Sequence, residues 1–120
     1  MTWLGYIDEQ LSSIINYELG LWTNEQLVFP YWVGEYQEVD YSHELHYHEY
    51  YFTLTGTTKG SIAQLEQDKE KILNIFSSHT SLIEDGHSIA VFYDTAFLLP
   101  CEDETIRRLQ INLTIKEWRD

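Results

Sequence analysis

The sequence contains only one cysteine, two prolines and six glycines in 120 residues. A lone Cys101 cannot form a disulfide within the chain, which excludes a small disulfide-stabilised scaffold. The scarcity of glycine and proline excludes low-complexity linkers and predicts a single domain over residues 1–120. No apolar run approaches the roughly 18 residues of a membrane span, and the N-terminal residues lack the basic flank and long apolar stretch of a signal peptide. We therefore expect a cytoplasmic protein without membrane association.

Positively charged residues are also scarce. Seven Lys and Arg stand against twenty Asp and Glu, which gives a formal net charge of −13. A surface of this sign repels phosphate backbones, so binding of DNA or RNA by counterion release is disfavoured. The charge fits two interpretations: simple solubility, or a passage through which a polyanion slides without binding.

Aromatic residues, in contrast, are abundant. Four Trp, nine Tyr and five Phe make up 15% of the chain. Tyr and Trp combine a large apolar area with a polar tip and are enriched at protein interfaces. They also fill core and cross-strand positions of small β-rich domains, so either interpretation stays open.

Apolar spacing predicts helices in two segments. A stripe three or four residues apart indicates a first helix over residues 3–18, with Thr2 as its N-cap and Gly20 as its stop. A second helix opens at Ser61, whose spacing to Gln64 matches a capping box. Its predicted buried stripe is Ile62, Leu65, Ile72, Ile75, Phe76 and the stem of Lys69, and its predicted solvated face is Gln64, Glu66, Gln67, Asp68, Glu70 and Lys71.

Strands are predicted in the remaining segments. Residues 28–41 and 49–57 are rich in β-branched and aromatic types, with Pro30 at the beginning of the first strand and Gly34 marking a bulge or a close approach. A further strand over 87–93 continues over 97–99 after a bend, and the last strand alternates most regularly, with Leu109, Ile111, Leu113 and Ile115 on one face. This order predicts an α+β fold: an antiparallel or mixed β-sheet with two α-helices packed on one face.

No catalytic motif is legible. The segment Gly56–Ser61 precedes a helix but lacks the Gly-Lys-Ser/Thr ending of a phosphate-binding loop, and no nucleophile elbow is present. We expect no enzymatic activity and no cofactor. The alternative hypothesis is a metal-binding enzyme or sensor that uses His43, His46 and His48, because imidazole and carboxylate ligands suit zinc. A polar hairpin tip explains the same cluster.

Three segments resemble the tail-completion proteins, or tail terminators, of siphophages and prophages. These are Tyr31–Tyr36, the run Phe52–Thr58 leading to Leu65–Ile72, and the closing stretch Ile106–Trp118. The resemblance implies a homo-oligomer, a hexamer on assembly, that caps the tail tube as a ring and joins it to the head connector proteins. It implies no catalytic residue, DNA that passes without specific binding, and a location in the host cytoplasm during assembly and at the tail end of the virion. Another head–tail adaptor or stopper is the related alternative.

The ring contacts are expected in segments that are predicted to lie outside the core. These are the connection over 40–48, the turn Gly56–Gly60 and the acidic turn Glu102–Glu104. The individual candidates are Asp40, Tyr41, Glu44, Tyr47, Thr57, Lys59, Glu102, Asp103 and Glu104.

Overall fold

The computed structural model describes residues 2–20, 28–39, 47–76, 79–82 and 87–118, with the side chains of 79–82 left out. Two helices and six strands follow one another along the chain. Their bounds are α1 Trp3–Ser12, β1 Tyr17–Leu19, β2 Tyr31–Glu38, β3 Tyr47–Lys59, α2 Ala63–Phe76, β4 His79–Leu82, β5 Ser88–Leu99 and β6 Ile106–Trp118.

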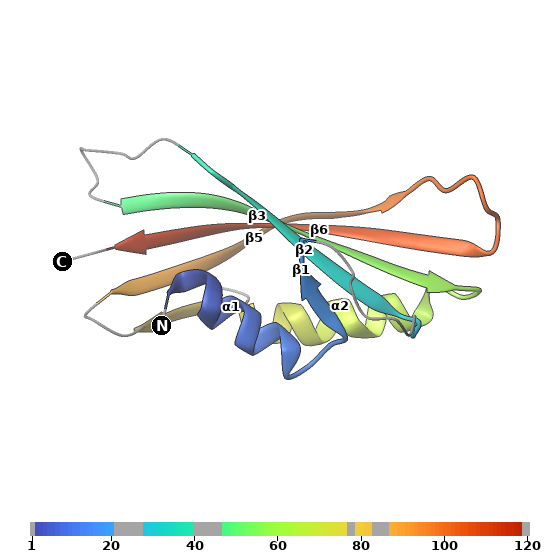
Figure 1. The fold of residues 1–120 in the computed structure, drawn as a ribbon, viewed down its shortest axis with the longest axis horizontal. Helices are drawn as coiled ribbons and strands as arrows, with labels where there is room; N and C mark the ends of the chain where they lie inside the picture. The colour runs from blue at the N-terminus through green and yellow to red at the C-terminus, as the bar shows by residue number, and fades with distance from the viewer. Residues whose placement is uncertain (1, 21–27, 40–46, 77–78, 83–86, 119–120) are drawn as a thin grey trace.

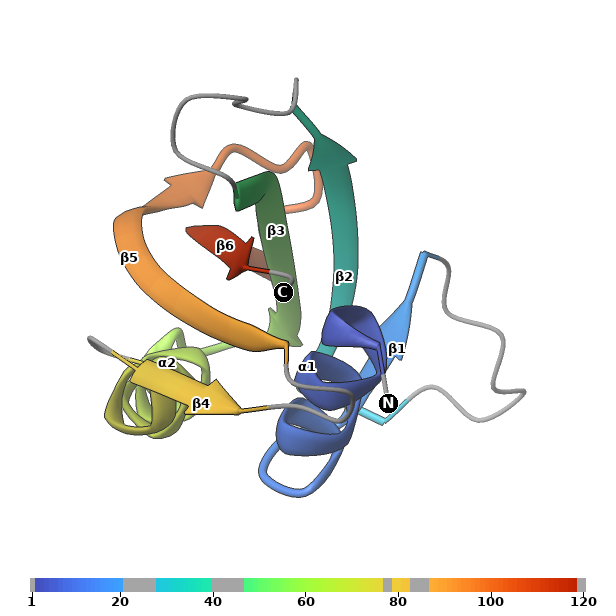
Figure 2. The same ribbon diagram turned by 90° about the vertical axis from the view of Figure 1, so that its left-hand side faces the viewer.

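The strands form one sheet in the order β1-β2-β3-β6-β5-β4. The pair β1–β2 is parallel and every other neighbouring pair is antiparallel. Both helices lie on the same side of the sheet (Figure 1). Viewed along the strands, the sheet curves over the helices, with α1 beside β1 at the lower end of β2 and α2 below β5 (Figure 2). The predicted α+β class with a mixed sheet and two helices on one face is confirmed.

The regular alternation of β6 explains its central place. Leu109, Ile111, Leu113 and Ile115 are all buried, while the residues between them face the other side of the sheet. They meet Phe52 and Leu54 of β3, which share their face and are fully buried. Burial of each such aliphatic or aromatic side chain contributes about 1.5–3 kcal/mol. The helices complete this core with Ile7, Leu11, Leu65, Ile72 and Phe76.

The first helix is shorter than its apolar spacing predicts. Thr2 caps α1 by accepting a hydrogen bond from the Gly5 N–H, but α1 ends at Ser12 rather than near residue 18. Residues 17–19 form β1 instead, because pairing with β2 satisfies their backbone groups. Gly20, at φ 81°, ends this strand and not a helix.

Two further elements correct the sequence-based expectations. The predicted turn Gly56–Gly60 is mostly strand, because β3 runs to Lys59 and pairs with β6 along its whole length. Only Gly60, at φ 81°, reverses the chain. The short strand β4 was not predicted, and it covers β5 only from Ser88 to Val91.

β5 itself is one strand with a register shift between Tyr93 and Thr95, at the position where a bend was expected. Gly34 lies in the regular part of β2, where an added Cβ would meet the Tyr17 hydroxyl at 2.7 Å. The predicted close approach at Gly34 is therefore confirmed, as a packing of side chains against the strand.

Candidate functional site

Large apolar side chains are exposed mainly along two edges of the sheet. Among the described residues, eight such side chains are exposed: Leu19, Val28, Tyr36, Tyr51, Phe92, Tyr93, Phe97 and Leu98. Four of them belong to β5, and three surround the end of β2. We call the segment Glu35–Glu38 the β2 edge and the segment Phe92–Leu99 the β5 edge. Scattered exposed apolar residues need no explanation, but their gathering along two strand edges marks candidate interaction surfaces.

The β2 edge begins where β1 stops. β1 pairs only with Trp32–Gly34, and no other described strand pairs with this side of β2. The Trp32 N–H donates to the Asn16 carbonyl and the Gly34 carbonyl accepts from Gly20, whereas the Val39 N–H donates inward to Glu49. Because backbone direction alternates along a strand, the N–H and C=O groups of Tyr36 and Glu38 point outward, as those of Trp32 and Gly34 do.

Two hollows flank the β2 edge. One has a volume of about 450 Å³ and is lined by Leu19, Gly20, Gly34, Glu35 and Tyr36. The other, of about 240 Å³, is lined by Glu35, Tyr36, Gln37, Tyr51 and Thr53. Tyr36 is 49% exposed, although its ring packs edge-on against Trp3 at 5.3 Å between centroids. The edge therefore offers outward backbone groups between two partly open hollows.

The β5 edge lies on the opposite side of the sheet. β4 stops opposite Val91, and no described strand covers β5 beyond that residue. Leu98 is the most exposed large apolar side chain of the described part of the chain, at 60%. The Lys116 ammonium lies 5.4 Å from the centre of the Phe92 ring. An uncovered, apolar strand edge of this length is a template for pairing with another strand.

The sheet face away from the helices carries a hydrogen-bonded polar row. The Asn112 amide donates to Thr95 at 3.0 Å, and its carbonyl oxygen accepts from Thr53 and Gln110 at 3.2 and 3.0 Å. On the same face Thr114 donates to Asp94. These groups satisfy one another across three strands, so this face presents little unsatisfied polar chemistry at its centre.

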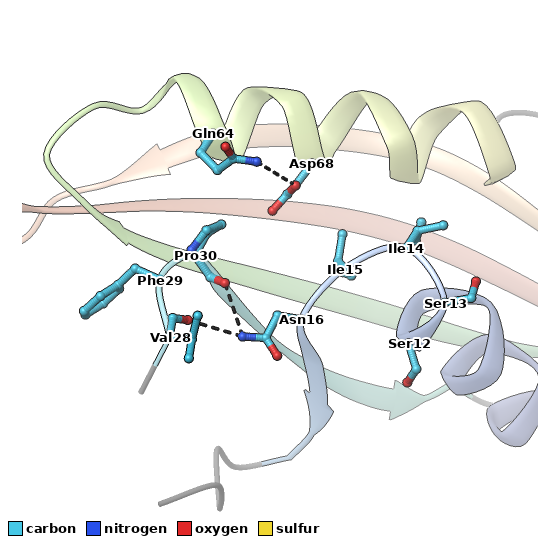
Figure 3. A pocket seen from close by; sticks show the side chains of 10 residues that line it. All are labelled: Ser12, Ser13, Ile14, Ile15, Asn16, Val28, Phe29, Pro30, Gln64 and Asp68. Carbon is cyan, nitrogen blue, oxygen red and sulfur yellow. Dashed lines mark hydrogen bonds between the residues drawn. The ribbon is translucent and has the colours of Figure 1, made fainter. Parts of the chain in front are cut away.

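A third hollow, of about 510 Å³, lies between the end of α1, the segment before β2 and the beginning of α2 (Figure 3). Asp68 lines it and is only 5% exposed, contrary to the prediction that it lies on the solvated face of the helix. Its carboxylate accepts from the Trp32 indole N–H at 3.0 Å and from Gln64 at 3.4 Å. Gln64 thus bonds forward to Asp68 and does not form the predicted capping box.

On the far side of that hollow, the side-chain amide of Asn16 forms hydrogen bonds to the backbone. Asn16 donates to the carbonyls of Val28 and Pro30 at 3.3 and 3.4 Å (Figure 3). Together, Asn16 and Asp68 join β1, β2 and α2 by hydrogen bonds. The polar groups in this hollow therefore bond mainly to the protein itself, as structural links do.

Two other partly buried polar pairs lie outside the edges. Tyr17 donates to Asp8 at 2.7 Å; burial raises the pKa of Asp8, and burial together with this bond raises the pKa of Tyr17. On the core face of β6, Glu117 is 2% exposed and lies 3.4 Å from the His87 imidazole.

The histidine cluster is described only in part. His43 and His46 lie outside the described residues. His48 lies on β3, opposite Glu117 of β6, and its Nδ1 is 4.0 Å from Glu38. Within the described ranges no three His, Cys, Asp or Glu residues are grouped as metal ligands. The metal site at His43, His46 and His48 stays a hypothesis, because two of its three ligands lie outside the described residues.

The candidate contact residues fall into three classes. Asp40, Tyr41 and Glu44 lie outside the described residues. Thr57 is buried, so it offers no contact area on the isolated subunit, because its segment is strand and not the expected turn. The rest are at least partly accessible: Tyr47, packed between Trp118 and Lys116, exposed Lys59, and the exposed turn Glu102, Asp103 and Glu104.

Within that turn, hydrogen bonds from Thr105 lower the pKa of Asp103. The Thr105 backbone N–H and hydroxyl donate to Asp103 at 2.8 and 2.7 Å, and Arg107 donates to the Glu104 carbonyl at 2.8 Å. The acidic turn is therefore an ordered connection between β5 and β6.

Neither strand edge was predicted from the sequence. One sequence feature does distinguish β5: apolar residues occupy both of its faces in the run Phe92–Leu99, interrupted by Asp94 and Thr95. Such a strand is typical of a position covered on both sides, yet here it lies at an edge. Apolar residues on both faces of β5 are therefore the sequence signal that could have identified this strand as an interaction surface.

Comparison of the chain with protein-family models and with characterised proteins finds no match. In the part of the chain that the structure describes, neither helix combines the length and apolar character needed to cross a bilayer.

Proposed function

We propose that this protein is a non-enzymatic assembly subunit that forms a ring at the end of a phage or prophage tail. The ring, a hexamer, closes the tail tube and joins it to the head connector. The observation that carries the proposal is a pair of opposite sheet edges that no described strand covers, with four exposed apolar side chains on β5 and Tyr36 on β2. A subunit that meets neighbours on two sides needs two such surfaces, whereas a monomeric enzyme needs none.

Charge supports the same role. With a net charge of −13 on 120 residues, the subunit repels DNA at close range. DNA leaving a phage head must pass the ring without being held. An acidic lumen serves this purpose, because no contact with the phosphate backbone gains free energy from counterion release.

The test uses tail tubes from a strain in which the gene for this chain is deleted. Purified protein is added to the tubes, and the tubes are pelleted and examined by negative-stain electron microscopy. We expect the protein to pellet with the tubes and to appear as a ring at one end, and the capped tubes to join DNA-filled heads. Tubes that bind no protein and join heads equally well without it would contradict the proposal.

The same experiment separates a terminator from a head–tail adaptor or stopper. A terminator binds the isolated tube in the absence of heads. An adaptor or stopper binds the connector of isolated heads and leaves isolated tubes bare. Binding to heads alone would therefore keep the assembly role but move the protein to the other side of the junction.

A further inference from the structure

We infer that neighbouring subunits join by sheet continuation: the β5 edge of one copy pairs, antiparallel, with the β2 edge of the next. This inference rests on the proposed ring and specifies its contacts. Each β2 edge supplies the outward N–H and C=O groups of Tyr36 and Glu38, and each β5 edge supplies a strand whose outer side no described strand covers. Backbone hydrogen bonds then hold the pair, and the apolar side chains beside the two edges are covered.

Charge favours this pairing over the pairing of like edges. β2 contains Glu35 and Glu38 and neither Lys nor Arg. Two cations lie near β5: the Lys116 ammonium lies over the Phe92 ring, and Arg108 is opposite Leu99. Two β2 edges brought together would set four carboxylates side by side, which is destabilising. A β2 edge against a β5 edge places those carboxylates near cations, although Asp94 offsets part of the gain.

The extents of β1 and β4 set the direction of the pairing. In a continued sheet, two strands lie along the outer side of the second copy's β2. They are its own β1, which pairs with Trp32–Gly34, and β5 of the first copy, and the two must not overlap. β5 must therefore end where β1 begins. With antiparallel strands, β1 falls beyond Leu99, where β5 has ended. With parallel strands, β1 would coincide with the first half of β5, which β4 already pairs. Only the antiparallel arrangement avoids this collision.

An interface between two different edges is heterologous. Each copy donates one edge and accepts with the other, so the pairing repeats from subunit to subunit and gives a ring where the rotation per subunit closes. A like-edge interface would stop at a dimer. Pairing between the two different edges of this sheet can therefore supply the contacts between neighbours in the proposed ring.

Two variants remove one edge each. Glu38→Pro deletes an outward N–H of β2 without removing a β2–β3 hydrogen bond, because only odd-numbered neighbours such as Val39 donate inward. Leu98→Glu places a carboxylate on the apolar β5 edge. The matched controls are Glu38→Ala, which keeps the N–H, and Val28→Glu, which adds the same charge at a side chain 54% exposed but outside both edges. Circular dichroism and urea unfolding verify that all four variants fold.

Sedimentation velocity then measures assembly across a concentration series. We expect wild type and both controls to form the ring species, and each edge variant alone to remain monomeric. An equimolar mixture of Glu38→Pro and Leu98→Glu should form a dimer and nothing larger, because one intact β5 edge meets one intact β2 edge. This heterodimer is specific to two-edge pairing.

The other outcomes separate the inference from the proposed function. Rings formed by either edge variant alone, or a mixture that stays monomeric while wild type forms rings, would overturn the edge pairing and leave the ring intact. Wild type that stays monomeric at millimolar concentration would overturn the edge pairing as well. Binding to tail tubes judges the function independently in that case.

Discussion

At the scale of single residues, the core contains polar groups that hold elements together. Asp68 and Trp32 are both buried, and their hydrogen bond ties α2 to β2 across the sheet. A buried donor lowers the stability of the fold when its acceptor is removed. The contribution of this hydrogen bond is therefore best measured by deleting the acceptor.

We expect Asp68→Ala to lower the free energy of unfolding by about 1–3 kcal/mol, because the indole N–H of Trp32 is left buried without its acceptor. Gln67→Ala is the matched control on the exposed neighbouring position and should change stability by less than about 0.5 kcal/mol. Urea unfolding followed by tryptophan fluorescence measures both. Equal effects of the two variants would show that the bond contributes nothing.

Asp8 gives the protein a pH dependence of known sign. Burial raises its pKa above the ordinary 3.8, and the bond from Tyr17 offsets this only in part. The folded state therefore holds the proton more tightly than the unfolded state. The stabilisation is complete below the unfolded pKa and is lost as pH rises through the folded pKa.

Asp8→Asn removes this titration while leaving an acceptor for the Tyr17 hydroxyl. We expect the variant to gain stability relative to wild type as the pH rises from below 3.8 to neutrality. Urea unfolding at a series of pH values measures the difference. Glu9→Gln, an exposed neighbour with the same change of charge, is the control; an equal pH-dependent gain in that variant would assign the effect to net charge alone.

At the scale of elements, α1 depends on its first turn. Thr2 Oγ1 accepts from the Gly5 N–H at 3.0 Å, and no acidic residue lies in the first turn of the helix to assist it. We expect Thr2→Ala to cost about 1 kcal/mol of stability, as for other N-caps. Thr2→Ser keeps the acceptor and should retain most of it. A loss of the same size in both variants, measured by thermal unfolding, would place the effect outside the cap.

Element types could be predicted from local pattern where burial is one-sided. β6 has one buried face and one accessible face, so its alternation alone defined the strand and its core residues. The end of α1 could not be predicted in this way. Ile14 and Ile15 continue the helical spacing, and both still contact the core, but from outside the helix. Pairing of Tyr17–Leu19 with β2, which depends on residues far along the chain, decides the boundary.

The candidate site could not be predicted from the sequence either, because it too depends on contacts between residues that are distant along the chain. Whether Tyr36 or Leu98 is exposed depends on how far β1 and β4 extend along their neighbours, and neither extent is encoded beside those residues. The sequence predicts that Asp68 lies on the solvated face of α2, because a carboxylate on a charged helix is usually exposed to water. Only the approach of Trp32 from another element gives it a buried partner.

At the scale of the whole molecule, copies of a chain with a net charge of −13 repel one another. The repulsion between exposed charges is screened beyond about 10 Å at 0.1 M salt. We expect formation of the proposed ring to strengthen as salt rises from low to moderate concentration, the opposite of binding to DNA. Sedimentation velocity in sodium chloride series measures this. Assembly that weakens with salt would indicate that the charge pairs between edges outweigh the overall repulsion.

The position of β6 determines when the subunit can fold during its synthesis. β6 is the most C-terminal of the described strands, yet it lies between β3 and β5 at the centre of the sheet. A nascent chain that has not yet exposed β6 leaves β3 and β5 with an unsatisfied strand edge each, and its core lacks Leu109, Ile111, Leu113 and Ile115. Folding of this sheet therefore waits until β6 has been synthesised, as expected for a topology dominated by pairings distant in sequence. A chain terminated before β6 cannot form this sheet, so the order of strands itself excludes such defective chains from the folded population.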